Sequence, residues 1–278
     1  MRATLVFAHD PGPWTGRGSN TWLIDGAEPA LIDTGSGRSQ HLDDLTRALG
    51  DDSTGDGVLL ARVLVTHAHT DHAGGAAAIA GRWPACEFAK FPWPERDTRY
   101  PVPWAPLADD DVVMAGATPL WVVHTPGHSP DHVCFFEPRS GTLFGGDLVM
   151  NGGTVVIPAS HGGSLSQYLC SLQRVLELGP RRILPGHGPA IDQPATLLRG
   201  YIAHRLARER QIADALHERS LTVAEIVATV YPGLQPDLTG AAAESVLAHL
   251  TKLREENRAQ PEAEHESQDA LTLRWSHV

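Results

Sequence analysis

The sequence of 278 residues contains only three cysteines, Cys86, Cys134 and Cys170. Their number is odd and their spacing fits neither a disulfide framework nor a cysteine zinc site, so we expect buried free thiols. No apolar run is long enough to span a bilayer. The first residues, MRATLVFAHDPGPW, also lack the long apolar stretch of a secretory signal. These absences predict a cytoplasmic protein without a membrane segment.

Positive charge is scarce as well. The chain has 22 Lys and Arg residues against 33 Asp and Glu, which gives a formal net charge of −11. Such a surface repels nucleic acids and acidic membranes on average, although bound metal ions would reverse the sign locally. The hydrophobic fraction of 42% and the short, regularly spaced apolar runs indicate a globular protein with a buried core.

Strand and helix patterns alternate through the first two thirds of the chain. RVLV, before Thr66, is typical of a strand, SQHLDDLTRALG of a helix ending at Gly50, and AGGAAAIAG of a small-residue helix. Three more strands are expected between about 112 and 145. Residues 91–106, FPWPERDTRYPVPWAP, contain five prolines and predict an extended segment without a helix. Its aromatic side chains either face a substrate or pack into the body of the protein.

From Pro194 onward the pattern becomes helical, with three amphipathic segments followed by a polar stretch and ALTLRW. Three helices and a hairpin are the order of a winged-helix unit. We therefore expect two domains, residues 1–193 and 194–278, with 260–269 either solvated or at the tip of the wing. Residues 196–278 contain nine Lys and Arg against twelve Asp and Glu, so no basic recognition helix is expected.

The segment THAHTDHAGG, residues 66–75, is the most distinctive feature of the sequence. It places His67, His69, Asp71 and His72 within six positions, directly after the expected strand RVLV. Imidazole and carboxylate groups suit zinc and similar metals, and four of them exceed what one tetrahedral ion easily takes from one loop. The loop therefore predicts two ions. Candidate ligands for completing both sites also follow apolar runs: His128 in VVHTPGH, Asp147 in LFGGDL and His187 in ILPGHGP.

The motifs THAHTDH, HTPGH, GGD and PGHGP, in this order, resemble the metallo-β-lactamase fold superfamily. The resemblance implies an α/β (α+β) protein, an αββα sandwich with its site at one edge of two facing sheets. GYIAHRLARERQI and the segment after it resemble the β-lactamase-like protein 2 subgroup, which adds a small C-terminal helical, winged-helix-like domain.

The resemblance also implies roles for individual residues. One ion would be held by His67, His69 and His128, the other by Asp71, His72 and His187, and Asp147 would bridge them. Asp33, in ALIDTG, matches a position that supports a metal-ligand histidine; the alternative is an aspartate that caps a turn. His124, His132 and His161 match no ligand position, and we expect ordinary polar residues there.

Two zinc ions, or other divalent metals, would hold a bridging hydroxide as the nucleophile of a hydrolysis, with Asp71 as a catalytic proton acceptor. The long helix from about 195 places Tyr201, His204 and Arg208 on one face. In the family this helix borders the active site, so Tyr201 and His204 either bind substrate or form a packing seam between domains.

Several functions are compatible with these residues. A small ester or thioester of the acyl-carrier or coenzyme A type is favoured as the substrate, because the resembling subgroup includes fungal polyketide thioesterases. A single-strand endoribonuclease, a lactonase or weak β-lactamase, and a non-catalytic winged-helix binding module are the alternatives. The acidic charge disfavours nucleic acid without excluding single-stranded RNA. An open set of seven ligands favours catalysis over a structural metal.

Overall fold

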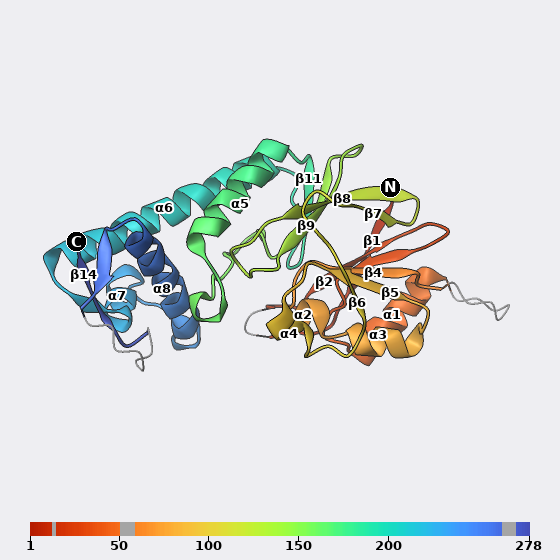
Figure 1. The fold of residues 1–278 in the computed structure, drawn as a ribbon, viewed down its shortest axis with the longest axis horizontal. Coiled ribbons are helices and arrows are strands. Elements are labelled where there is room, and N and C mark those ends of the chain that lie inside the picture. The colour runs from red at the N-terminus through yellow and green to blue at the C-terminus, as the bar shows by residue number, and fades with distance from the viewer. Residues whose placement is uncertain (13–14, 51–58, 263–270) are drawn as a thin grey trace. The chain divides into compact units, whose positions relative to one another are not determined.

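The computed structural model describes residues 1–12, 15–50, 59–262 and 271–278. Its elements, labelled in Figure 1, group into two compact units. The first comprises Met1–Thr125, Asp131–Gly153 and Leu178–Ala195, and the second comprises Pro126–Pro130, Thr154–Glu177 and Thr196–Val278. The expected domain boundary at 194 coincides with the start of helix α6 (Pro194–Glu218), but the second unit also takes in chain that precedes this helix. The boundary stays a prediction.

The first unit contains two sheets. The six-stranded sheet has the order β1-β2-β3-β4-β5-β6, formed by Ala3–Phe7, Asn20–Ile24, Ala30–Ile32, Arg62–Val65, Glu87–Lys90 and Trp104–Pro106. Strands β1 to β3 are antiparallel, whereas β3 to β6 run parallel.

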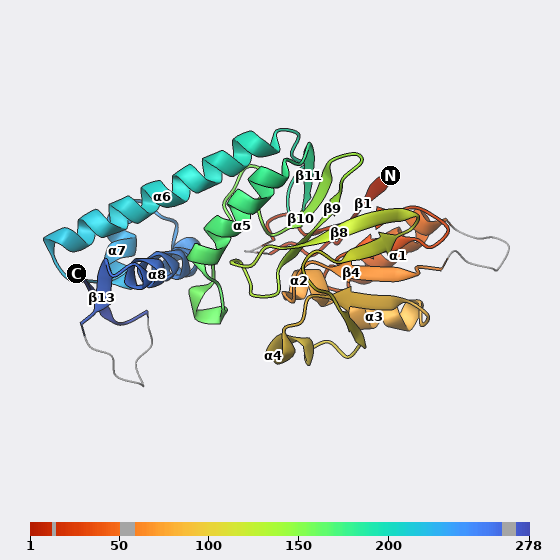
Figure 2. The ribbon, with the colours of Figure 1, turned by 45° about the horizontal axis from the view of Figure 1, so that its top comes forward.

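The five-stranded sheet has the order β11-β10-β9-β8-β7 and is visible in Figure 2. It is formed by Arg182–Pro185, Thr142–Gly146, Val133–Glu137, Thr118–His124 and Val112–Ala115. Only β10 and β11 pair in parallel. Four strands therefore lie where the sequence predicted three. The extra one arises because Gly116 adopts a positive φ of 60°, which lets two residues turn β7 back onto β8.

Apolar side chains fill the space between the two sheets. Ile32 and Leu64 of the first sheet belong to the same buried cluster as Val122, Phe135 and Phe144 of the second. The other face of the six-stranded sheet is covered by α1 (Ser39–Leu49), α2 (Thr70–Ala73) and α3 (Ala76–Arg82), seen below it in Figure 1. Burial on both faces explains why these strands are short, continuous apolar runs.

Two sequence expectations need correction. Residues 91–106 do contain a helix, the single turn α4 (Pro94–Asp97), because a proline at the first helical position gives up only an N–H that has no partner inside a helix. All three cysteines are free, but only Cys134 is buried, whereas Cys86 is half-buried and Cys170 is exposed. Cys170 lies on an outward position of helix α5 (Leu165–Leu178), which the spacing argument did not consider.

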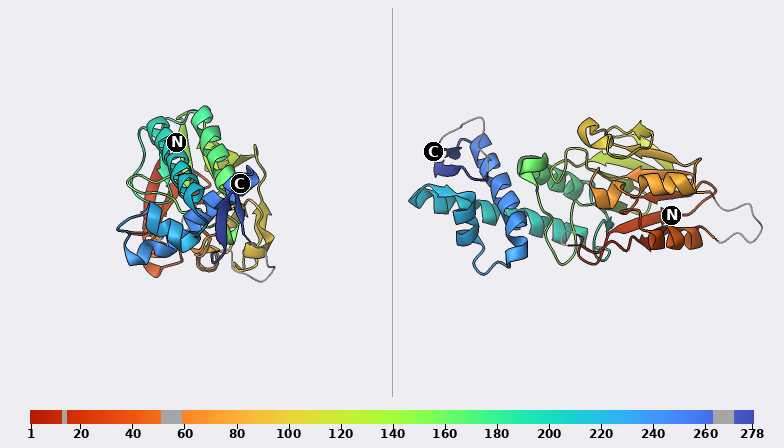
Figure 3. Two further views of the ribbon diagram at one scale, coloured as in Figure 1. Left: turned by 90° about the vertical axis from the view of Figure 1, so that its left-hand side faces the viewer. Right: turned by 90° about the horizontal axis from the view of Figure 1, so that it is seen from below.

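The C-terminal part of the second unit has its own core. Helices α6, α7 (Val223–Val230) and α8 (Thr239–Glu255) pack with a three-stranded sheet of order β12-β14-β13, formed by Leu221–Thr222, Arg274–His277 and Ala259–Pro261. In Figure 3, β13 and β14 are the dark blue strands beside the C-terminus. Thr222 and Glu225 form a capping box that starts α7. Residues 263–270, most of the expected wing tip, lie outside the described residues.

The order of three helices and a hairpin confirms the winged-helix prediction. Among the described residues, no helix combines the length and the hydropathy needed to cross a membrane.

Candidate metal centre

Parallel strand pairing brings distant polar residues to one edge of each sheet. Because β3 and β4 are parallel, Asp33 and Thr66 follow their last residues at the same edge. The parallel pair β10 and β11 does the same for Asp147 and His187. A backbone hydrogen bond from Val133 N to Thr66 O (2.8 Å) joins the two sheets at this edge. Polar side chains placed just beyond the carboxyl ends of strands are a common basis for a functional site.

Four donor atoms converge at this edge. The Nε2 atom of His72 lies 3.2 Å from Asp71 Oδ2 and 3.3 Å from Asp147 Oδ1. The Nε2 atom of His187 lies 3.1 and 3.3 Å from the same two oxygens. Four ligands around a tetrahedral ion with bonds of about 2.0–2.1 Å would be separated by roughly 3.3–3.4 Å. The four atoms, all within 4.8 Å of one another, therefore have the spacing of a single small metal ion.

The electrostatics of this set reflect its two half-buried carboxylates. Burial would lower the pKa of His187, but Asp147 and Asp71 outweigh it and raise the value to about 10. The pKa of His72 is likewise raised despite burial, by Asp71, Asp147 and Asp33. Burial would raise the pKa of Asp71 and Asp147, yet the two histidines hold both values well below the usual range. The carboxylate oxygens attract a cation, and metal binding would displace the protons of the two imidazoles.

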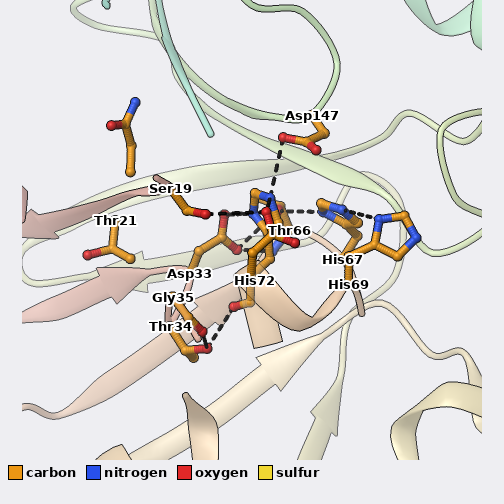
Figure 4. A network of polar contacts seen from close by, with 12 residues as sticks. Ser19, Thr21, Asp33, Thr34, Gly35, Thr66, His67, His69, His72 and Asp147 are labelled. Carbon is orange, nitrogen blue, oxygen red and sulfur yellow. Dashed lines mark hydrogen bonds and ion pairs between the residues drawn. The ribbon is translucent and has the colours of Figure 1, made fainter. Parts of the chain in front are cut away.

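His72 has a fixed ring. Its Nδ1 lies 2.8 Å from Asp33 Oδ2, while its buried Nε2 faces the carboxylates of Asp71 and Asp147. Asp33 Oδ1 also accepts hydrogen bonds from Thr66 N (2.7 Å) and Thr66 Oγ1 (3.0 Å). Figure 4 shows this network. The geometry agrees with a supporting role for Asp33, which stays a prediction until metal binding is measured.

His67 and His69 also lie close together, in the first part of the histidine loop, residues 66–72. His67 Nε2 lies 3.0 Å from His69 Nδ1, a separation that two ligands of one ion would adopt (Figure 4). His128 belongs to the second unit, in the connection between β8 and β9. There its Nδ1 lies 2.7 Å from the carbonyl of Val156, which orients the ring. Its participation with His67 and His69 remains a prediction.

Two glycines allow the close approach of the donor atoms. A Cβ on Gly186 would lie 2.6 Å from His72 Cε1 and 2.8 Å from Asp147 Oδ1. A Cβ on Gly146 would lie 2.7 Å from His132 Nε2 and 2.8 Å from Thr66, and its φ of 46° already favours glycine. The glycine-containing turns of GGD and PGHGP are therefore required by packing.

Sequence reasoning missed several residues around this centre. Ser19 donates a hydrogen bond from its hydroxyl to Asp71 Oδ2 (3.2 Å). His132, expected to be an ordinary polar residue, is fully buried, and its Nε2 accepts a hydrogen bond from Asp147 N (3.0 Å). Its Nδ1 lies 2.8 Å from Thr125 Oγ1. The sequence did offer one indication: His132 directly precedes the apolar run VCFF, which favours burial with that strand, and a buried polar side chain needs hydrogen-bond partners.

The three residues singled out on α6 have different environments. Tyr201 is buried, whereas His204 is exposed. Arg208 donates a hydrogen bond to Val230 O (2.5 Å) and lies over the ring of Tyr231 at 4.0 Å. Arg208 thus secures α6 to the end of α7, a structural task within the second unit.

Comparison with known proteins identifies the family. A family model described as "Metallo-beta-lactamase superfamily" matches residues 14–187. The chain belongs to this superfamily. A second model, described as "Beta-lactamase associated winged helix domain", matches residues 222–268. The protein is a hydrolase of the metallo-β-lactamase superfamily with a C-terminal winged-helix domain, as the sequence predicted.

Curated relatives cover most of the chain. The "Beta-lactamase-like protein 2 homolog" of Drosophila melanogaster is 34% identical over 265 residues, which covers 91% of this chain and 88% of the relative. The "Atrochrysone carboxyl ACP thioesterase nsrC" of Aspergillus novofumigatus is 31% identical and covers 83% of this chain and 71% of the relative.

Solved structures support the fold. A metallo-β-lactamase family protein from Thermus thermophilus superimposes with a TM-score of 0.80 at 23% identity, covering 99% of this chain and 98% of that chain. A protein solved in a di-iron-bound form has a TM-score of 0.54 at 29% identity and covers 68% of this chain and 96% of its own.

Proposed function

We propose that this protein is a dinuclear zinc hydrolase of thioesters of the acyl-carrier or coenzyme A type. The observation that carries the proposal is the group of four donor atoms from Asp71, His72, Asp147 and His187, two of which follow the His67–His69 pair in the same loop. The arrangement has the ligand chemistry of zinc, nitrogen and carboxylate oxygen, with no cysteine among the predicted ligands. Because one similar protein was solved in a di-iron-bound form, any test of the proposal must include other metals besides zinc.

In this proposal one ion is held by His67, His69 and His128 and the other by Asp71, His72 and His187, with Asp147 between them. The buried Nε2 of His72 supports the assignment, because it lies 3.2 Å from Asp71 Oδ2 and 3.3 Å from Asp147 Oδ1, the spacing of ligands to one small ion. The tetrahedral spacing around it supports a small divalent ion. The orientation of His128 by Val156 O gives its ring the fixed tautomer that ligand histidines usually have.

When bound, two divalent ions supply an activated water and an electrophile for the substrate carbonyl. The residues of the chain supply the rest. Asp71 is the proposed acceptor of the proton that the attacking water loses, because its carboxylate lies within the donor set, 3.2 Å from His72 Nε2 and 3.1 Å from His187 Nε2. The Ser19 hydroxyl, donating to Asp71 Oδ2, fixes the orientation of that carboxylate. His132 fixes the backbone of Asp147 by accepting a hydrogen bond from its N–H.

The substrate class rests on the relatives and on charge. A relative with 31% identity is named as an acyl carrier protein thioesterase. Residues 196–278 carry nine Lys and Arg against twelve Asp and Glu, which disfavours RNA, the main alternative. Three free cysteines fit a reducing compartment, and we include a cytoplasmic location in the proposal.

A substrate panel tests the proposal. Metal-replete protein is incubated with an acyl-coenzyme A thioester, an acyl-pantetheine thioester, the matching oxygen ester, a lactone, a cephalosporin and single-stranded RNA. Chelated protein and the Asp147→Ala variant serve as controls. The expected result is thioester hydrolysis that is lost in both controls. Metal-dependent cleavage of RNA alone, or of the lactone or cephalosporin alone, would replace thioesterase with that activity.

A further inference from the structure

Ala68, the residue between His67 and His69, is held by side chains at both of its backbone groups. Its N–H donates to Asp131 Oδ2 at 2.8 Å, and its carbonyl accepts from the Tyr100 hydroxyl at 2.9 Å. Ala68 itself is 1% exposed. Both contacts come from outside the histidine loop, over 63 and 32 residues of sequence. The peptide planes that carry the two histidines are therefore fixed from two directions.

Asp131 is in turn anchored by a buried cation. Lys90 Nζ lies 3.2 Å from Asp131 Oδ2, and both side chains are at most 1% exposed. Lys90 ends β5 and pairs in register with Val65, the last residue of β4, so its side chain starts beside the point where the histidine loop begins. Its Nζ also lies 2.6 Å from Asp97 Oδ1 on α4. A carboxylate that is paired with a lysine ammonium is a stronger acceptor for the Ala68 N–H than a neutral group would be.

Both sets of contacts that support Ala68 involve residues 91–106, the segment of prolines and aromatic residues. Tyr100 belongs to this segment, and so does Asp97, whose Oδ2 accepts a hydrogen bond from Trp93 N at 2.8 Å. A one-turn helix between prolines is a rigid support, because proline fixes the backbone on either side. Residues 91–106 therefore contact the groups that hold the histidine loop. The two expectations for this segment, a substrate-facing loop and aromatic side chains packed into the body, did not include this role.

We propose that Tyr100, Asp131 and Lys90 are positioning residues for the metal ligands His67 and His69, acting through the two backbone groups of Ala68. The inference rests on the proposed metal site but on no particular substrate. Release of either backbone group would let the peptide on one side of Ala68 rotate and change the distance between the two imidazoles, now 3.0 Å between His67 Nε2 and His69 Nδ1. Loss of a group that orients metal ligands commonly weakens metal affinity about 10- to 100-fold.

The test measures zinc affinity by competition with a chelator, without any substrate. Tyr100→Phe removes only the hydroxyl, and Asp131→Asn keeps the shape but loses the charge. Each is expected to weaken binding of one ion about 10-fold. Substitution with cobalt(II) adds a spectroscopic readout, since its visible absorption reports the geometry of the ligands. Tyr231→Phe, in the second unit, is the matched control and should change neither readout.

Two backgrounds identify which ion is affected. In a His187→Ala background the remaining ion belongs to the His67 and His69 pair, and Tyr100→Phe should still weaken it about 10-fold. In a His69→Ala background the remaining ion belongs to the other set, and the same change should have no effect. Equal losses in both backgrounds, or unchanged zinc affinity and cobalt spectrum in both Tyr100→Phe and Asp131→Asn, would overturn the proposal. Intact metal binding without thioester hydrolysis would instead refute only the proposed substrate.

Discussion

His72 Nδ1 lies 2.8 Å from Asp33 Oδ2, and both side chains are almost fully buried. This contact fixes the ring so that Nε2 faces Asp71 and Asp147. Asp33 reaches His72 because its backbone adopts a positive φ of 63°, in the left-handed region that Asp and Asn tolerate best among residues with a side chain.

Replacing Asp33 by Asn should therefore preserve the backbone while removing the charge that orients His72. We expect zinc affinity of the Asp71–His72 set to fall about 10- to 100-fold, measured by chelator competition. Asp44→Asn is the matched control, because Asp44 also pairs with a histidine, His9, at 2.6 Å but away from the donor set. Unchanged affinity in Asp33→Asn would leave Asp33 as a turn residue only.

Asp147→Ala should remove most hydrolytic activity while leaving the fold intact. The side chain faces Nε2 of both His72 and His187, so its loss takes away one of four donors and, in our assignment, the bridge between the ions. Elemental analysis should show fewer than the two ions expected for the unaltered protein at saturating zinc. Near-normal turnover with two ions bound would exclude Asp147 as a bridging ligand.

Gly186→Ala should disrupt the metal centre although it replaces none of the proposed ligands. The new methyl group would lie 2.6 Å from His72 Cε1, closer than two carbon atoms can approach, so His72 or the turn must shift. We expect weaker zinc binding and a lower melting temperature. Gly81→Ala in α3 is the control: a Cβ there meets nothing within 4 Å, and alanine should stabilise the helix by about 0.5–1 kcal/mol. Equal zinc affinity in the two variants would contradict the packing argument.

The candidate ligands could be proposed from sequence because each follows a short apolar run, and because four of them share six consecutive residues; that they bind metal stays a prediction. The contacts that hold these residues in place could not be predicted from the sequence. Ser19 meets Asp71 across 52 residues, and Asp131 meets Ala68 across 63, and neither residue stands out in its local sequence. Such contacts depend on which strands pair in parallel, a property that periodicity does not specify. The helix at Pro94 was missed for a different reason, since the position of proline within a helical turn decides whether it is tolerated.

Tyr201→Phe and His204→Ala test whether α6 contributes to substrate selection. If both side chains contact substrate, each change should lower kcat/KM several-fold without altering metal content. Tyr201 is buried and His204 exposed, so a packing role would show as reduced thermal stability for Tyr201→Phe alone. Arg208→Ala should lower stability because it detaches α6 from Val230 O. Unchanged kcat/KM in both Tyr201→Phe and His204→Ala, with stability lowered in Tyr201→Phe alone, would exclude a role of these side chains in substrate binding.

Stability should depend on pH through His41, which is fully buried in α1 with Nε2 2.8 Å from Thr21 Oγ1. Burial is the main cause that lowers its pKa from 6.5 to about 4. Between these values the unfolded chain binds more protons than the folded one. The contribution of His41 is therefore complete above pH 6.5 and is lost progressively as the pH falls toward 4, by at most about 3 kcal/mol.

His41→Gln keeps a polar group near Thr21 but cannot titrate, so thermal unfolding of this variant should vary less between pH 6.5 and 4 than that of the unaltered protein. The exposed His161, changed to Gln, is the control and should leave the pH profile as it was. His249 in the second unit, whose pKa burial lowers to about 3, should keep its own dependence in both variants. If His41→Gln and the unaltered protein lose stability in parallel over this range, His41 does not sense pH, and the buried carboxylates or His249 must account for the acid sensitivity.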